Sequence, residues 1–267
     1  MHGVSGQPDA LRRMQIGGEI ALIRRYQIKM LAEADTHINS SLAYSFYGEL
    51  MRHISCGFAD QIHEQGFTPI SQFVESTGGS SFVWHVTLFG DRAVGEVSPF
   101  LDRLSSVSLD DKDITLHVDS TPEIIETDLR EILMNASKSE EEYSQREIRL
   151  ITPTTFKSAG EYVLFPSASL VIRSLVSSWN ALQGEIVLDD EDMLRMLHEG
   201  IRISGYRLFS TTYRMKGQHI PSFTGTLRFR SRLSAPLKNI WEALLLFGEY
   251  SGMGIKTALG MGGYKIN

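Results

Sequence analysis

The order of strand-like and helix-like patterns constrains the fold of this chain more than any other feature of its sequence. Residues 19–31 alternate apolar and polar side chains, which is typical of a half-buried strand. The patterns that follow in the first half are helices at 42–54 and 57–65, β-rich stretches between 71 and 97, a helix at 98–106 and a strand at 114–119. This β, α, β, β, α, β order predicts a ferredoxin-like sandwich.

The second half of the chain repeats the same kind of order after a change in composition. Residues 129–146 are polar and acid-rich, and this composition predicts a linker. The elements predicted beyond it are a strand at 147–151, helices at 167–182 and 189–197, strands at 201–213 and 223–233, a helix at 236–247 and a strand at 263–266. The expected class is therefore α+β, with two tandem ferredoxin-like domains at 1–128 and 147–267.

Charge is unevenly distributed along the chain. The 26 Lys and Arg residues against 32 Asp and Glu residues give a net charge of −6, which by itself argues against a polyanionic partner. Residues 201–267, however, carry ten basic and two acidic side chains, or +8, which leaves −14 for residues 1–200. The C-terminal quarter is therefore a basic module on an acidic body.

Three arginines alternate with other side chains near the end of the predicted strand at 223–233. Because residues two apart on a strand share a face, Arg228, Arg230 and Arg232 line one side at intervals of about 6 to 7 Å. No acidic residue interrupts this arginine stripe, whereas solvated faces usually mix the signs of their charges. The spacing is close to that of phosphates along an extended single strand and favours a nucleic-acid contact.

The segment 252–265 is unusually rich in glycine. Glycine is costly to order, so such a density is expected where backbone must approach another group closely and present bare N–H groups to an anion. The Gly spacing matches neither a P-loop nor a dinucleotide-binding fingerprint. The predicted nucleic-acid contacts in this glycine segment are Gly252, Gly254, Lys256, Thr257, Gly260, Gly262 and Gly263. Together with the arginine stripe they would form one positively charged corner.

The glycine segment, EYSGMGIKTALGMGGYKI, also resembles the C-terminal signature of the repeat-associated mysterious protein (RAMP) superfamily. Three further segments are similar to one member family: ADQIHEQG, ITPTTFKS with LFPSASLVIRSLVSSWNAL, and FTGTLRF. That family is the CRISPR-associated endoribonuclease that processes precursor CRISPR RNA. The resemblance covers about residues 18 to 266 and implies two ferredoxin-like domains with RNA bound along or between them. It also implies metal-independent cleavage on the 3′ side of a repeat hairpin, with a 2′,3′-cyclic phosphate and a 5′-hydroxyl as products.

The chemistry of such a cleavage can be stated from RNA itself. The 2′-hydroxyl is the nucleophile, so the enzyme needs a base to deprotonate it, an acid for the leaving 5′-oxygen and donors for the charge of the phosphorane. No metal or other cofactor is expected. The sequence has no HExxH motif, and its acidic clusters at 110–113 and 189–192 are explained by a turn and by the positive end of a helix.

Among the histidines, His63 fits the acid/base role best. It lies near the C-terminal end of the short helix at 57–65, where the helix dipole favours a protonated ring. The resemblance implies that a histidine in an L/I-H-E context is catalytic, which Ile62-His63-Glu64 matches, and that Tyr47 assists. A lysine that often follows this histidine in the family is absent here, so Lys256 or an arginine would stabilise the transition state. Because the family moves its catalytic histidine, His37 is the main alternative.

Other interpretations of the same residues remain open. A non-catalytic RNA-binding subunit of a CRISPR effector complex would need the basic module and no histidine, and a binder of a small anionic ligand or of another protein is a third alternative. The partners expected for the endoribonuclease are CRISPR repeat RNA and its product, with other effector subunits or a homodimer as further candidates. No membrane-spanning segment or secretory signal is expected, so the sequence predicts a cytoplasmic prokaryotic enzyme.

Overall fold

The computed structural model describes residues 22–32, 38–65, 67–109, 113–138, 145–182, 184 and 186–267. Its first sheet is antiparallel and has the order β2-β3-β1-β5-β4, with β6 also paired to β1. These strands are β1 (Ile23–Ala32), β2 (Ile70–Gly78), β3 (Ser81–Phe89), β4 (Ser106–Leu109), β5 (Ile114–Val118) and β6 (Glu123–Thr127). Helices α1 (Leu42–Arg52), α2 (Cys56–Gln65) and α3 (Asp91–Leu101) pack on one face around a core that includes Phe46 and the fully buried Trp84.

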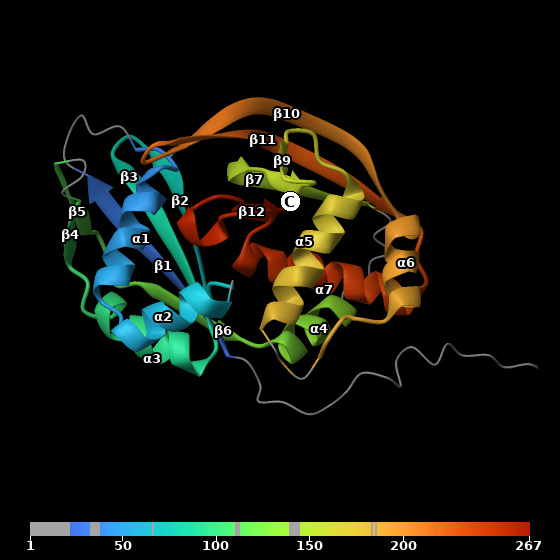
Figure 1. The fold of residues 1–267 in the computed structure, drawn as a ribbon, viewed down its shortest axis with the longest axis horizontal. Coiled ribbons are helices and arrows are strands. Elements are labelled where there is room, and N and C mark those ends of the chain that lie inside the picture. Colours follow the sequence, from blue (N-terminus) through green and yellow to red (C-terminus); the bar gives the residue numbers. More distant parts are fainter. Residues whose placement is uncertain are drawn as a thin grey trace, which may run out of the picture.

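The second sheet is also antiparallel and has the order β10-β11-β7-β12. Its strands are β7 (Gln145–Thr154), β10 (Ile201–Met215), β11 (Gln218–Ser231) and β12 (Tyr264–Ile266), and a separate hairpin pairs β8 (Phe156–Ser158) with β9 (Glu161–Val163). Helices α5 (Ala168–Ala181), α6 (Glu191–Gly200) and α7 (Ala235–Ser251) lie below this sheet in Figure 1. In the first sheet β1 lies between β3 and β6, and in the second sheet β7 lies between β11 and β12. In each sheet the first strand thus pairs with the third and the last strands in chain order, which is the ferredoxin-like arrangement. The predicted class of two tandem ferredoxin-like units is confirmed.

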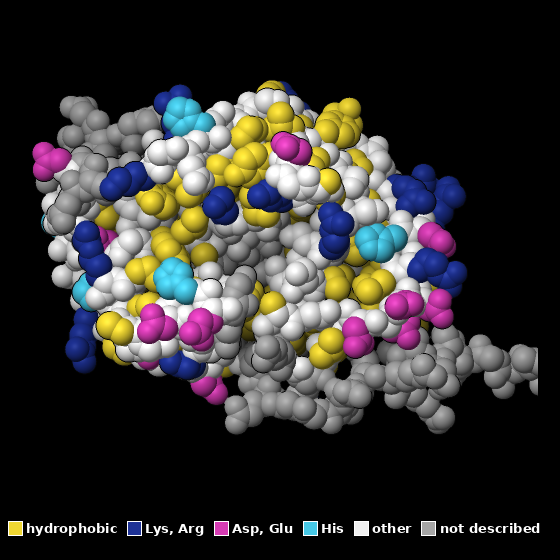
Figure 2. Space-filling view, in the orientation of Figure 1, with side chains coloured by type: hydrophobic (Ala, Val, Ile, Leu, Met, Phe, Trp, Pro, Cys, Tyr) yellow, Lys and Arg dark blue, Asp and Glu magenta, His cyan; other side chains and the backbone are white. Residues whose placement is uncertain are grey.

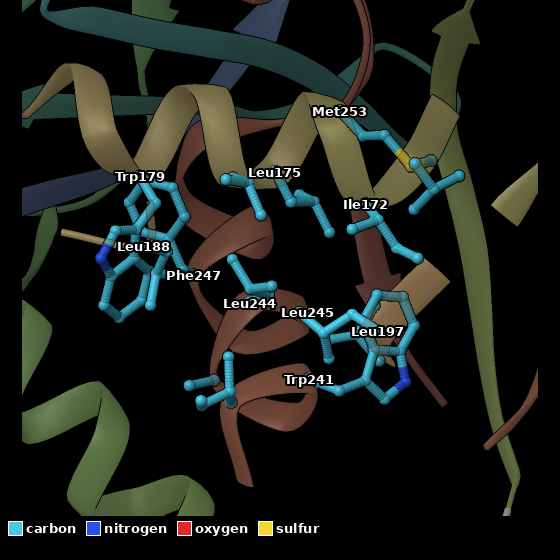
Figure 3. Packing of buried hydrophobic residues seen from close by; sticks show 14 of the residues in the cluster. Ile172, Leu175, Trp179, Leu188, Leu197, Trp241, Leu244, Leu245, Phe247 and Met253 are labelled. Atoms are coloured by element: carbon cyan, nitrogen blue, oxygen red, sulfur yellow. The ribbon is translucent and has the colours of Figure 1, made fainter. Parts of the chain in front are cut away.

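The second core lies between α5 and α7. Figure 3 shows Leu175 and Trp179 of α5 directed toward Leu244 and Phe247 of α7. Trp179 and Phe247 meet edge to face, with ring centroids 5.3 Å apart. Ser167 begins α5 by accepting a hydrogen bond from the Leu170 N–H, so the helix starts where its sequence predicts. Within the described ranges, no helix is both long and apolar enough to cross a membrane.

Residues 93–97 correct a prediction. Their sequence, AVGEV, was predicted as a strand and the next residues as a helix, but the helix α3 already begins at Asp91 and ends at Leu101. Gly90 has a φ of 84°, which turns the chain sharply after β3. The buried residues then recur at helical spacing (Ala93, Val94, Val97 and Leu101). The valines favour a strand by local preference, but these residues form a helix because that conformation buries their apolar side chains against the sheet.

The segment 129–146 is not only a linker. Helix α4 (Leu129–Ser137) occupies half of it, and β7 starts at its end. Asp128 accepts a hydrogen bond from the Glu131 N–H and so caps the helix, while Ile132 and Ala136 are buried in the second core. Most of the acidic run that suggested a linker follows the helix, and residues 139–144 lie outside the described residues. The domain limits themselves remain a prediction.

The two units are joined by the open face of the first sheet. Arg25 of β1 is half-buried there and donates hydrogen bonds to Thr87 of β3 (3.2 Å) and to the Glu249 carbonyl of α7. Its guanidinium also lies 4.5 Å from the centre of the Tyr250 ring. Burial lowers the pKa of Arg25 to about 10, so it remains charged at neutral pH. A hydrogen-bonded guanidinium therefore fixes the first sheet against the end of α7.

Candidate active site

Tyr47 and His63 lie on consecutive helices of the first domain, α1 and α2, which the short loop 53–55 connects. Tyr47 is half-buried on α1, and His63 is exposed in the last turn of α2, directly after the buried Ile62. The Tyr47 hydroxyl is hydrogen-bonded to Thr68, in the connection that follows α2. Burial raises the pKa of Tyr47, so its hydroxyl keeps its proton at neutral pH. The structure thus anchors Tyr47 to the segment that carries the chain away from His63.

His37, the alternative acid/base residue, lies outside the described residues. The described chain resumes at Ile38, and α1 begins at Leu42.

The glycine segment is largely buried, which corrects the expectation that it presents bare N–H groups. All five predicted glycines donate their N–H groups within the protein. Gly252 donates to Gly248, Gly254 to the Ser174 hydroxyl (2.8 Å), Gly260 to Thr257, Gly262 to Pro153 and Gly263 to the Thr152 hydroxyl (2.9 Å). An anion could not take these donors without displacing existing hydrogen bonds. The glycines are needed for close packing instead.

Close approaches explain where those glycines occur. A Cβ at Gly260 would lie 2.2 Å from the Cβ of Ala43 on α1, and one at Gly254 would lie 2.3 Å from the Thr155 carbonyl oxygen. At Gly263 it would lie 2.5 Å from the Phe73 ring of β2. Each distance is too short for any side chain. The glycine segment therefore fills the seam between α1, β2 and the end of β7.

Two buried side chains hold the glycine segment against the first domain. Gln72 of β2 donates to the carbonyls of Ala43 (2.8 Å) and Ala258 (2.9 Å) and accepts from the Trp84 indole (2.7 Å). Tyr213 of β10 donates to the Leu259 carbonyl. Burial raises the pKa of Tyr213 above its usual value, so its hydroxyl remains a donor. The backbone carbonyls of the segment are thus also used inside the protein.

Cations are nevertheless found beside the glycine segment. Lys256 is half-buried and adopts a left-handed conformation (φ 59°), and Thr257 packs its methyl group toward Gly252. The sequence did not reveal that the tip of the β10–β11 hairpin also lies here, where Tyr213 and Ile220 pack on Met261 of the glycine segment. Exposed basic residues flank this buried contact. These residues are Arg214, Lys216 and His219. The hairpin tip and the glycine segment are far apart in the chain, so the spacing of residues could not show that these positive charges lie beside the segment.

The arginine stripe has the predicted alternation. Arg228 and Arg230 are exposed on β11, whereas Leu227 and Phe229 are buried, and Arg232 is exposed just beyond the strand end. Arg228 forms an ion pair with Glu147 (2.7 Å), so an acidic residue from β7 does lie against the stripe. Arg230 lies opposite Arg202 of β10 in the register. The stripe is therefore exposed and partly neutralised.

The stripe and the glycine segment do not form one corner. Tyr264 and Lys265, at the end of the glycine segment, pair with Leu150 and Arg149 in the middle of β7. Arg228, however, pairs with Glu147 at the start of β7, while Gly262 and Gly254 contact Pro153 and Thr155 at its end. At about 3.3 Å per residue, these positions lie about 20 Å apart along the strand. The expectation of a single positive corner is wrong, because strand β7 separates its two halves.

Other basic residues near the seam are already paired. Glu75 of β2 accepts from Lys265 (2.6 Å) and His85 (3.2 Å) and lies 3.4 Å from Arg149. The hydrogen bond with His85, followed by Lys265, lowers the pKa of Glu75 to about 2. Lys265 and Arg149 thus fix β2 against β12 and β7 through Glu75. Among the described residues, no group of three or more His, Cys, Asp or Glu side chains is arranged to hold a metal ion.

Comparison with known proteins identifies the family. The CRISPR-associated endoribonuclease Cas6 of Streptococcus thermophilus is 36% identical over 231 residues, which are 86% of this chain and 93% of that protein. The chain belongs to the Cas6 family. The Cas6 endoribonuclease of Mycobacterium tuberculosis is 27% identical over 230 residues, covering 85% of this chain and 72% of that protein. The family model of CRISPR-associated endoribonuclease Cas6 matches residues 148–264, from β7 to the glycine segment.

Solved Cas6 structures share the fold. A Cas6 product complex superposes with a TM-score of 0.73 at 20% identity, covering 93% of this chain and 100% of that chain. A Cas6 substrate mimic complex gives 0.68 at 17% identity over 93% and 100% of the two chains. A histidine-to-alanine mutant of Cas6 gives 0.70 at 17% identity over 92% and 99%. At these identities the likeness concerns the fold, and the resemblance noted from the sequence is confirmed at the level of the family.

Proposed function

We propose that this Cas6 family member cleaves CRISPR repeat RNA without a metal ion, by attack of the 2′-hydroxyl on the neighbouring phosphate. The 2′-oxygen forms a bond to phosphorus, the bond to the 5′-oxygen breaks, and the products carry a 2′,3′-cyclic phosphate and a 5′-hydroxyl. One group takes the proton of the 2′-hydroxyl, and another returns a proton to the leaving 5′-oxygen. The reaction balances without an external reagent.

His63 is proposed as the residue that transfers protons and Tyr47 as its partner. The observation that carries this assignment is the hydrogen bond between the Tyr47 hydroxyl and Thr68, five residues after His63, which is exposed in the last turn of α2. The protonated Tyr47 hydroxyl can donate a hydrogen bond to a phosphate oxygen or orient the 2′-hydroxyl. Solvent exposure leaves His63 open to a bulky polynucleotide.

Lys256 is the proposed donor for the charge that develops on the phosphorane, with Arg214 and Lys216 holding neighbouring phosphates. All three lie beside or against the glycine segment, which packs on α1 through Gly260 and Ala43. The arginine stripe is proposed as a second phosphate contact at the far end of β7. Similar solved structures described as Cas6 product and substrate mimic complexes support an RNA-binding role for this fold.

One cleavage assay tests the reaction class. The protein is incubated with a labelled CRISPR repeat RNA in excess EDTA, and the ends of the products are mapped. We expect one cut, a cyclic phosphate terminus and complete protection by a 2′-deoxy substitution at the cut site. Binding without a cut would support the alternative of a non-catalytic RNA-binding subunit. Loss of cleavage in EDTA that is restored by a divalent ion would overturn the metal-independent mechanism.

Single substitutions decide which histidine acts. His63→Ala should lower the single-turnover rate by about 10² or more while affinity for a non-cleavable RNA stays within a few-fold. His53→Ala is the matched control, because His53 is also exposed near the end of a helix, but its ring is stacked on Phe100 at 4.0 Å. An unchanged rate in His63→Ala, with a large loss in His37→Ala, would transfer the role to His37.

A further inference from the structure

An exposed, largely aromatic cluster lies on and next to the β8–β9 hairpin and has no role in the chemistry above. It consists of side chains from β9, the connection to α5, and β10: Tyr162, Leu164, Phe165 and Tyr206, here called the aromatic platform. Phe165 and Tyr206 are 60% and 59% exposed, and Tyr162 and Leu164 are 38% and 45% exposed. Large apolar side chains are seldom left this exposed in a group unless something binds to them.

The platform is built on a rigid support. The β8–β9 hairpin turns at Ala159 and Gly160, which both have positive φ (49° and 86°), as in the tightest two-residue turns. Phe156 is buried at its base and stacks on Phe223 of β11, with ring centroids 6.2 Å apart. Phe165 and Tyr206 contact each other edge to face at 5.1 Å. The exposed rings are therefore held in position before any ligand arrives.

Basic groups accompany these rings. The Lys157 ammonium lies 6.0 Å from the centre of the Tyr162 ring. Arg173, eight residues after Phe165 in the chain, is exposed on α5. Glu161 is the acidic residue of the hairpin turn. Figure 2 shows hydrophobic side chains together with Lys and Arg side chains over the β8–β9 region, above the hollow between the two halves of the molecule. Aromatic faces combined with cations suit bases joined by phosphates.

The base of the hairpin that carries Tyr162 is hydrogen-bonded to the glycine segment. The Ile255 N–H donates to the carbonyl of Thr155 (3.1 Å), the residue before β8, and Gly254 is in close contact with the same carbonyl. The Thr155 hydroxyl in turn donates to the Val163 carbonyl of β9 (3.1 Å). A polynucleotide bound beside Lys256 would therefore meet the hairpin next along its path.

We infer that the aromatic platform stacks unpaired nucleotides of the RNA on one side of the cleavage site. This inference rests on the proposed function, because it extends the path of the same RNA. An RNA explains the cation beside the Tyr162 ring better than an apolar protein partner does, since such a partner would gain little from Lys157. The stacked bases would be bound through their ring faces, so the platform should tolerate many sequences.

A fluorescent single strand tests the inference directly. The probe is an RNA oligonucleotide of about a dozen nucleotides, with a 2-aminopurine base and a matched set of abasic substitutions. Phe165→Ala with Tyr206→Ala should weaken binding about 10-fold or more and abolish the quenching of the fluorescent base. The abasic probe should bind the unaltered protein about as weakly as the intact probe binds the double variant.

The matched control is Met134→Ala, which removes an apolar side chain of similar exposure (54%) from α4. Melting temperatures of both variants should stay near that of the unaltered protein, because the replaced side chains are exposed. Unchanged affinity and quenching in the double variant, with normal cleavage, would overturn the platform and leave the proposed function intact. A change of oligomeric state or loss of a protein partner, with RNA binding unchanged, would overturn it in favour of a protein interface. Absence of both RNA binding and cleavage in the unaltered protein would instead remove the proposed function.

Discussion

The two ends of strand β7 show how similar sequence signals acquire different meanings. At its end, the glycine segment is packed into the seam, and its N–H groups are used within the protein. At its start, Arg228 and Arg230 remain exposed, and Arg228 is paired with Glu147. Both regions were predicted from the sequence as RNA contacts. The difference teaches that glycine density here reflects close packing, whereas alternating arginines do reach the surface.

The largest expected effect distinguishes close packing from backbone conformation. Gly260→Ala should lower the free energy of unfolding by about 4 kcal/mol, because its Cβ would collide with Ala43 and its φ is 98°. Gly78→Ala is the control, since φ is also positive (114°) but nothing lies within 4 Å of the added Cβ. Chemical denaturation of both variants measures the difference. Equal losses would mean that the glycine segment is not closely packed against α1.

The next largest effect on stability is expected for a buried glutamine beside the glycine segment, Gln72, compared with an exposed one at the start of β7, Gln145. Gln72→Leu should cost about 3 kcal/mol of unfolding free energy, because it leaves two carbonyls and the Trp84 indole without their partner. Gln145→Leu, at the exposed start of β7, should change stability by less than about 0.5 kcal/mol. Urea unfolding followed by tryptophan fluorescence reports both values. A small loss in Gln72→Leu would contradict its role in holding the seam.

Acid should weaken the seam through Glu75. Its folded pKa of about 2 lies below the usual 4.5, so it contributes stability above pH 4.5 that is lost as the pH falls toward 2. Allowing for its partial exposure, the contribution is about 1–2 kcal/mol. The stability difference between the unaltered protein and Glu75→Gln should shrink over that range. Glu147→Gln should show a smaller change, because Glu147 is more exposed; the reverse ranking would contradict the seam assignment.

The smallest effect concerns the arginine stripe. Arg230→Ala should leave stability within about 0.5 kcal/mol but reduce the slope of log affinity against log salt by about 0.7, the value for one phosphate contact with a single strand. Arg228→Ala should have a weaker effect on the slope, because Arg228 already interacts with Glu147. Binding titrations of a non-cleavable RNA at several salt concentrations test this ranking. An unaltered slope in both variants would assign the stripe to solvated surface.

Local patterns predicted most of the architecture. The amphipathic run from 167 to 182 formed α5, and the alternation predicted for 223–233 is present in β11. The prediction failed at residues 93–97, where β-branched residues occur in a helix, and at 129–137, where α4 lies within the segment that the following acid-rich run marked as a linker. In both places, burial of a few apolar residues against a distant partner outweighed local preference.

The candidate site was less accessible to sequence reasoning. The motif around His63 and the matching position of Tyr47 could be recognised, but the role of Thr68 in fixing that tyrosine could not. The basic tip of the β10–β11 hairpin and the aromatic platform were both missed. Their members come from segments far apart in the chain, so no spacing connects Phe165 with Tyr206 or Ile220 with Met261.

By itself, the sequence determined the class of fold, the alternation that exposes the arginines and the family to which the chain belongs. These properties depend on period, composition and short motifs, which act over a few residues. Only the tertiary structure decided that the glycine segment is an interior contact, that strand β7 separates it from the arginines, and that exposed rings lie on and next to the β8–β9 hairpin. Those outcomes depend on which surfaces from distant parts of the chain pack against one another and become buried. The order of residues along the chain does not by itself specify these contacts.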